Sequence, residues 1–163
     1  MGENRGKAFE NIIKEAFLKV PDVSVDRLHD QMTGYKVTSA NICDFIVYKK
    51  PYEYYIECKS VHGNTLPFSN ITTNQWNGLL EKSKIDGVYA GVIVWYVDKD
   101  VTRFVPIQFL QQAKGKGFVS LPSDYEKKWI LDDYKYLPFD ISGQKKRIFW
   151  DYDMTTFFKE VST

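Results

Sequence analysis

The chain has 163 residues, of which 44% are hydrophobic and 26% charged, a balance that suits one soluble globular domain with a sizeable core. Its 22 basic and 21 acidic residues leave a net charge of +1, which argues against a uniformly basic nucleic-acid coat but not against a basic patch. The N-terminal stretch lacks an apolar signal core, and the longest apolar run, residues 88–97, is too short to span a membrane. We therefore expect a cytoplasmic protein whose two cysteines are reduced.

The first predicted element is a helix over residues 7–20. Apolar residues recur there at helical spacing and form one stripe, and Glu10 lies one step round from Phe9 at the edge of that stripe. We expect Glu10 to be half covered by whatever this helix packs on. Residues 23–28 alternate apolar and polar side chains and predict a strand, and the polar residues 29–41 predict a loop or an extended arm.

The next stretch, "ICDFIVYKKPYEYYIECKS", predicts two strands joined by a two-residue turn at its Lys-Pro step. That turn pairs Asp44 with Glu57 on one face of the hairpin, with Lys59 on the same face two residues further on. The same register is expected to place Cys43 opposite Cys58 on the other face, as reduced core thiols.

The second half of the chain continues as helix, strand, strand, helix. A helix capped by Thr72 or Thr73 carries Gln75, the apolar run predicts a central buried strand, and Pro106 opens a short helix after a further strand. The fold class is therefore α/β, in the order αβββαββ, with a mixed sheet of about five strands flanked by helices and a small irregular C-terminal extension. For that extension the sequence predicts a helix at 123–134, an extended piece at 145–152 and a short helix at 154–161.

Two carboxylates paired across a hairpin repel each other, which raises the pKa of at least one of them, unless a cation lies between them. Mg²⁺ prefers such hard oxygen ligands. Glu10 supplies a third carboxylate, Lys59 an ammonium that can stabilise charge on a phosphoryl group, and Gln75 an amide that can orient a water or ligand. Taken alone, the hairpin charges are also what an ordinary solvated face would carry.

The combination resembles the PD-(D/E)xK nuclease superfamily, in which a helix with Glu precedes strands that carry Asp and Glu-x-Lys. Here these motifs read "CDF" and "ECK", with Cys43 in place of the family's Pro. The start "NRGKAFE" resembles Holliday junction resolvases, both the archaeal type and the RecU-like proteins of Gram-positive bacteria and their phages. The resemblance implies one nuclease domain over 1–163, with a restriction-endonuclease-like core at about 5–113 and a C-terminal extension at about 114–163.

The resemblance also implies roles for individual residues. Asp44 and Glu57 would hold Mg²⁺ or Mn²⁺, with Glu10 completing the metal site, Lys59 acting at the scissile phosphate and Gln75 supporting them. Residues 29–41 would insert at the centre of the junction. Candidate DNA contacts are Arg5, Lys7, Arg27 and Lys36.

The function so implied is a metal-dependent, structure-selective endodeoxyribonuclease that resolves four-way DNA junctions in homologous recombination, as a homodimer and without a small-molecule cofactor. Two alternatives stay open: a nuclease of this fold with another DNA specificity, such as a repair or restriction type, and a non-catalytic DNA-binding protein. The basic run 145–147 is interpreted first as a solvated turn and second as a DNA contact.

Overall fold

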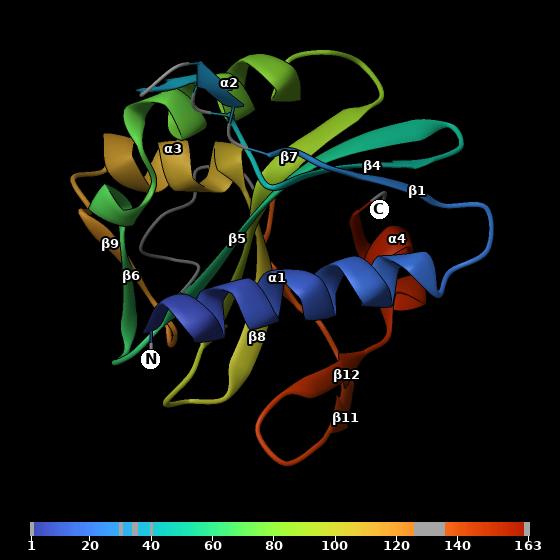
Figure 1. The fold of residues 1–163 in the computed structure, drawn as a ribbon. Coiled ribbons are helices and arrows are strands. Elements are labelled where there is room, and N and C mark those ends of the chain that lie inside the picture. Colours follow the sequence, from blue (N-terminus) through green and yellow to red (C-terminus); the bar gives the residue numbers. More distant parts are fainter. Residues whose placement is uncertain (1, 30, 34–35, 40, 126–135, 162–163) are drawn as a thin grey trace.

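The structure is a computed structural model that describes residues 2–29, 31–33, 36–39, 41–125 and 136–161; at 2–4, 31–33 and 36–39 it describes the backbone alone. A mixed sheet forms its centre, with the strand order β1-β4-β5-β7-β8-β10 (Figure 1). Neighbouring strands are antiparallel except β5 and β7, which are parallel. The strands are β1 Ser24–Arg27, β4 Phe45–Lys49, β5 Tyr52–Val61, β7 Val88–Tyr96, β8 Val101–Pro106 and β10 Phe139–Asp140.

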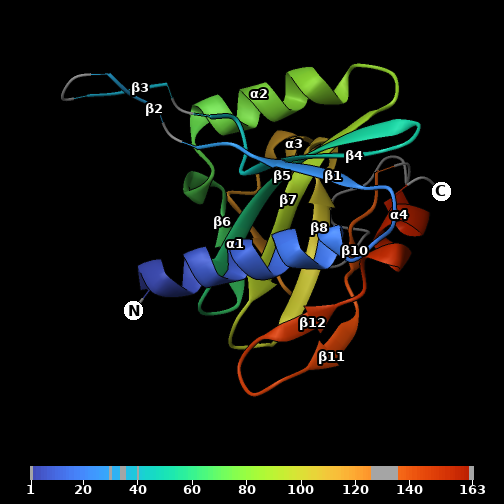
Figure 2. The same cartoon turned by 45° about the vertical axis from the view of Figure 1, so that its right-hand side comes forward.

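This architecture confirms the predicted α/β class and mixed sheet. The five predicted strands are consecutive neighbours in the sheet, and the C-terminal part of the chain adds β10 as a sixth strand beside β8. Helices cover both faces, α1 and α4 on one side and α2 and α3 on the other (Figures 1 and 2). The helices are α1 Gly2–Leu18, α2 Thr73–Ser83, α3 Ile107–Gly115 and α4 Met154–Val161. Among the described residues, no helix combines the length and apolar character needed to cross a membrane.

The first helix differs from its prediction at both ends. It begins at Gly2 and ends at Leu18, where the backbone tightens: the Lys19 amide still donates to the Glu15 carbonyl, but Val20 donates to Phe17. Apolar side chains decide which face of the helix is buried, but hydrogen bonding in the last turn decides where it ends.

The core lies in two layers, one on each face of the sheet. Strand alternation sends Tyr54, Ile56 and Cys58 of β5 into the layer under α1 and α4, and Tyr55 into the layer under α2 and α3. Both cysteines are buried and free, as predicted, but Cys43 packs in the second layer and not beside Cys58. The expectation that they share a face is wrong, because Cys43 precedes β4 and the strand alternation does not extend to it.

The predicted register of the hairpin is confirmed. Phe45 pairs with Ile56 and Lys49 with Tyr52, so the turn falls at Lys50-Pro51. Asp44 lies one residue before β4, and its amide donates to the Ile56 carbonyl at 3.0 Å, one residue out of step with the ladder. The predicted pair of Asp44 with Glu57 therefore lies just beyond the regular pairing, although the Asp44 carboxylate still reaches β5 at the Cys58 amide.

Smaller elements complete the chain. In the predicted arm, β2 (Gln31–Thr33) and β3 (Lys36–Ser39) pair with each other and project from the body (Figure 2). The expected extended piece at 145–152 is instead a hairpin, because residues 146–149 turn the chain between β11 (Gly143–Lys145) and β12 (Trp150–Tyr152). Most of the helix expected at 123–134 lies outside the described residues. The remaining elements are β6 Thr65–Pro67, η1 Phe68–Asn70 and β9 Ser120–Pro122.

Candidate active site

Glu57 is the most deeply buried charged side chain of the site. It lies within β5 and is 3% exposed. Its Oε2 atom accepts a hydrogen bond from the Gln75 amide at 3.1 Å and lies 3.1 Å from the Lys59 ammonium. Its Oε1 atom is buried and has no hydrogen-bond partner among the described residues. A buried acceptor without a partner destabilises the fold, so this oxygen is suited to a cation that binds there.

Asp44 is the second carboxylate. Its Oδ2 atom accepts the Cys58 backbone N–H at 2.8 Å, which fixes the side chain against β5. Burial raises the pKa of Asp44 above its ordinary value, and the nearby charge of Glu10 adds to this, although the Cys58 hydrogen bond opposes it. Burial likewise raises the pKa of Glu57, and the charge of Asp44 raises it further. The two carboxylates thus destabilise each other in their charged forms.

Glu10 reaches the same place from α1 and is paired with Arg27. The Arg27 Nη2 atom lies 2.6 Å from Glu10 Oε2, so the two side chains form an ion pair. Arg27 is the last residue of β1, and its guanidinium also lies 5.9 Å from the centre of the Phe45 ring. Glu10 is therefore half covered, as predicted, and an internal cation already neutralises it.

Gln75 is oriented by the helix cap that precedes it. The Thr72 hydroxyl accepts the Gln75 backbone N–H at 3.1 Å, and the Gln75 side-chain oxygen accepts the Thr72 backbone N–H at 3.0 Å. This capping box leaves the amide nitrogen of Gln75 free to donate to Glu57. The start of α2 thus determines which end of the amide faces the carboxylate.

These residues surround one cleft of about 420 Å³. Its lining brings together six of the predicted site and DNA-contact residues: Lys7, Glu10, Arg27, Asp44, Glu57 and Gln75. Lys59 contacts Glu57 beside this cleft and is 22% exposed. Arg5 lies apart from it, with its guanidinium 3.1 Å from the His62 ring and 6.0 Å from the centre of the Trp95 ring. The side chain of Lys36 is outside the described part of the chain.

Sequence reasoning missed the Arg27–Glu10 ion pair and the structure at the base of the arm. Arg27 pairs with Phe45 across β1 and β4, which puts it one residue from the level of Asp44. The alternation of residues 23–28 together with the hairpin register would have indicated this neighbourhood. Asn41 closes the arm at its base, where its side-chain amide donates to the His29 carbonyl at 2.8 Å.

The donor set fits a hard divalent cation. Carboxylate oxygens of Asp44 and Glu57, one of them without a partner, are the ligands that Mg²⁺ and Mn²⁺ prefer. Among the described residues, no three histidine, cysteine, aspartate or glutamate side chains converge closely enough to hold an ion. Glu10 faces Arg27, so only a change in that ion pair would make it a third ligand.

Comparison with known proteins supports the fold. A search of protein-family models finds no match, and a search of curated proteins finds none either. Among solved structures, the chain is similar to Hjc of Archaeoglobus fulgidus, a Holliday junction resolvase from an archaeal hyperthermophile. The TM-score is 0.51 and the sequence identity 17%, over 77% of this chain and 91% of that chain. The restriction-endonuclease-like fold expected from the sequence is thereby confirmed.

Proposed function

We propose that this protein is a metal-dependent endodeoxyribonuclease that resolves four-way DNA junctions. The observation that carries the proposal is the buried Glu57, which has one oxygen without a partner beside Asp44, with Lys59 3.1 Å away. An ordinary solvated hairpin face has no reason to bury a carboxylate in this way. The likeness to an archaeal Holliday junction resolvase supports the substrate class, and the RecU-like resemblance stays a prediction.

In this proposal Asp44 and Glu57 hold Mg²⁺ or Mn²⁺, which when bound supplies positive charge to the phosphate and lowers the pKa of a coordinated water. Gln75 keeps the Glu57 carboxylate in one orientation through the hydrogen bond that its capping box directs. Lys59 holds its ammonium beside Glu57 and stabilises the negative charge that develops on the phosphate oxygens. A P–O bond to the water oxygen forms and the bond to the leaving sugar oxygen breaks; the water gives up a proton to solvent, and the leaving oxygen takes one up.

Arg27 and Lys7 complete the cleft on the side of the substrate. Both are cations that line the same cleft as the carboxylates, and phosphate contacts from such side chains fix the position of a DNA backbone. The projecting strands β2 and β3 follow directly from the strand that carries Arg27. We propose that this arm lies against the branch point, so that selectivity for junctions comes from shape.

A junction has near two-fold symmetry, so a two-fold homodimer would present one cleft to each of two opposed strands. The decisive experiment is cleavage of a synthetic mobile four-way junction with Mg²⁺ or Mn²⁺, with mapped cut positions. Paired, symmetric nicks are expected. Equal cutting of linear duplex, flap and nicked DNA would favour a nuclease of another specificity. Binding without any cutting under either metal would favour the non-catalytic alternative.

A further inference from the structure

The β11–β12 hairpin is fixed to the end of the main sheet by one carboxylate. Asp100, in the turn between β7 and β8, accepts the indole N–H groups of Trp95 at 3.1 Å and Trp150 at 2.8 Å. Its other oxygen lies 2.7 Å from the ammonium of Lys145. Lys145 and Trp150, on either side of the hairpin turn, thus contact the same Asp100 carboxylate. This part of the C-terminal segment is held in place by several polar contacts.

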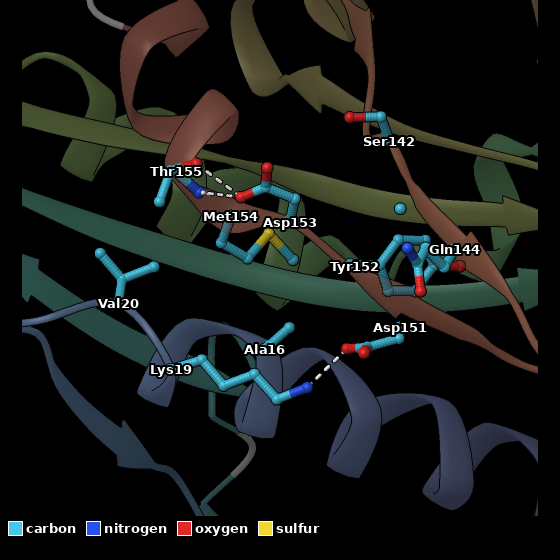
Figure 3. Close-up of a pocket in the computed structure, with 11 residues that line it drawn as sticks. Ala16, Lys19, Val20, Ser142, Gln144, Asp151, Tyr152, Asp153, Met154 and Thr155 are labelled. Carbon is cyan, nitrogen blue, oxygen red and sulfur yellow. Dashed lines mark hydrogen bonds and ion pairs between the residues drawn. The ribbon is translucent and has the colours of Figure 1, made fainter.

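The stem of the hairpin also contacts the residue that follows α1. Lys19 reaches across a cleft of about 580 Å³ to Asp151, with 2.5 Å between the ammonium and the carboxylate (Figure 3). Two residues later Asp153 accepts the backbone N–H of Thr155 at 3.0 Å and ties the start of α4. Both sides of the hairpin are therefore anchored, and its tip has a defined direction.

The tip, residues 146–149, carries exposed cations on this fixed support. The Lys146 amide donates to the Phe149 carbonyl at 2.9 Å and closes the turn. Lys146 and Arg147 are exposed, and neither forms an ion pair with any described residue. Ile148, the next residue, is 56% exposed. Lys145 neutralises Asp100, whereas the exposed Lys146 and Arg147 lie beyond ion-pair distance of any described carboxylate, with Lys146 attracted by Asp151.

Phe149 of the tip and Arg5, which is predicted to contact DNA, pack on the same tryptophan. The Phe149 ring packs on Trp95 at 5.5 Å between centroids, and the Arg5 guanidinium lies over the same indole at 6.0 Å. Trp95 therefore packs against Arg5 from the N-terminal part of α1 and against the Phe149 ring of the hairpin. Lys7, one turn of helix or less from Arg5, lines the active-site cleft.

We infer that the β11–β12 tip is a second DNA-binding site, which takes the phosphate backbone of a duplex arm that leaves the active-site cleft past Arg5. Unpaired Arg and Lys side chains on a fixed support suit phosphate contacts, which carry no sequence information. The inference rests on the proposed function for its substrate. It assigns to residues 146–149 the binding of a DNA duplex arm, away from the branch point and from the cleavage site.

The test is DNA binding by a double variant, K146A with R147A, measured by fluorescence anisotropy in EDTA so that nothing is cut. Lys145 is left in place because it holds Asp100. The matched control is K50A with K84A, which removes two exposed lysines at the opposite end of β5 and β7. We expect the Kd for a long-armed junction to rise roughly tenfold in the tip variant, and the logarithmic salt dependence to become shallower by about 1 to 2. The control should bind like the wild type.

Arm length gives a second readout. On a junction whose arms are too short to reach the tip, the wild type and the tip variant should bind equally. Wild-type affinity and salt dependence in the tip variant would overturn the inference, even if the wild type resolves junctions. Weaker arm binding in the variant would support it, even if the wild type cuts nothing and the proposed function fails. A wild type that does not bind DNA would overturn both.

Discussion

Asp100 and Glu57 each have a lysine within hydrogen-bond distance, but they differ in burial and in how their oxygens are paired. Asp100 receives three donors shared over both of its oxygens. Burial alone would raise its pKa, but the hydrogen bonds from Lys145, Trp150 and Trp95 outweigh burial and hold the pKa of Asp100 below its ordinary value. This carboxylate ties the C-terminal hairpin to the sheet.

Glu57 is buried with one oxygen that no described residue pairs, and burial together with the charge of Asp44 raises its pKa. The Lys59 ammonium contacts the same Glu57 oxygen, Oε2, that already accepts a hydrogen bond from the Gln75 amide. A lysine neighbour therefore does not distinguish a structural carboxylate from a functional one. The number of hydrogen-bond donors to each oxygen does distinguish them, because a carboxylate that binds a ligand keeps an unused acceptor oxygen while no ligand is bound.

The largest predicted effect is on the rate of junction cleavage. We expect D44N, E57Q and K59A each to lower junction cleavage by roughly 10³-fold or more, since the interactions removed are worth several kcal/mol in the transition state. Steady-state rates on a mapped junction, with thermal melting to verify folding, provide the measurement. Wild-type rates in both D44N and K59A would show that the chemistry lies elsewhere.

The next effect is the pH dependence of stability without metal. A carboxyl whose native pKa is raised binds its proton more tightly in the folded state, so the free energy of unfolding falls as pH rises above the ordinary carboxyl range. In EDTA, urea unfolding of the wild type should show this fall toward neutral and alkaline pH, and E57Q should reduce it. D151N is the control: the hydrogen bond from Lys19 lowers the pKa of Asp151, so its contribution is lost only as pH falls. A fall in E57Q as steep as in the wild type would contradict the assignment.

A smaller effect is expected at the structural carboxylate. D100A removes the acceptor of three donors and should lower the free energy of unfolding by about 2 kcal/mol, because the site is partly exposed and each bond contributes modestly. D100N keeps an acceptor for the indoles and should cost less. Cleavage per folded molecule, measured well below the melting temperature, should stay at the wild-type level in both. A loss of turnover in D100N without a loss of stability would mean that Asp100 also serves the active site.

The smallest effect concerns the cap of α2. T72A removes the hydroxyl that accepts the Gln75 backbone N–H, so it should lower the free energy of unfolding by about 1 kcal/mol. The Thr72 backbone N–H still donates to the Gln75 side-chain oxygen, so the less firmly held start of α2 should reduce kcat by only about twofold. KM for the junction should not change, because Thr72 touches no DNA-facing group. T72S keeps the hydroxyl and should restore both values. Equal turnover in T72A and wild type would limit the capping box to a structural role.

Much of the fold was accessible from the sequence because local patterns decide it. The apolar stripe with Phe9 and Phe17 predicts α1, and the two-residue turn at Lys50-Pro51 fixes the register of β4 and β5, which ends just before Asp44. Binary patterns cannot show how far a pleat continues past the end of a strand, so Cys43 was placed on the wrong face. Nor could they show that β10, two residues long, would join the sheet.

The candidate site was predicted in composition but not in its ion pairs. Glu10, Asp44, Glu57 and Gln75 do line one cleft, as the combined motifs indicate. Strand pairing could have placed Arg27 near Asp44, but not against Glu10, because that contact joins a helix to an edge strand through tertiary packing. Long-range pairs of this kind depend on how layers pack, which single-sequence periodicity does not describe.

The central claim is that Glu57 and Asp44 form a metal site whereas Asp100 does not. The most direct measurement is Mn²⁺ binding by isothermal titration calorimetry, without DNA. The wild type and D100N should bind Mn²⁺ alike, and D44N and E57Q should bind it at least roughly tenfold more weakly. Undiminished Mn²⁺ binding by E57Q, or loss of it in D100N, would contradict the account.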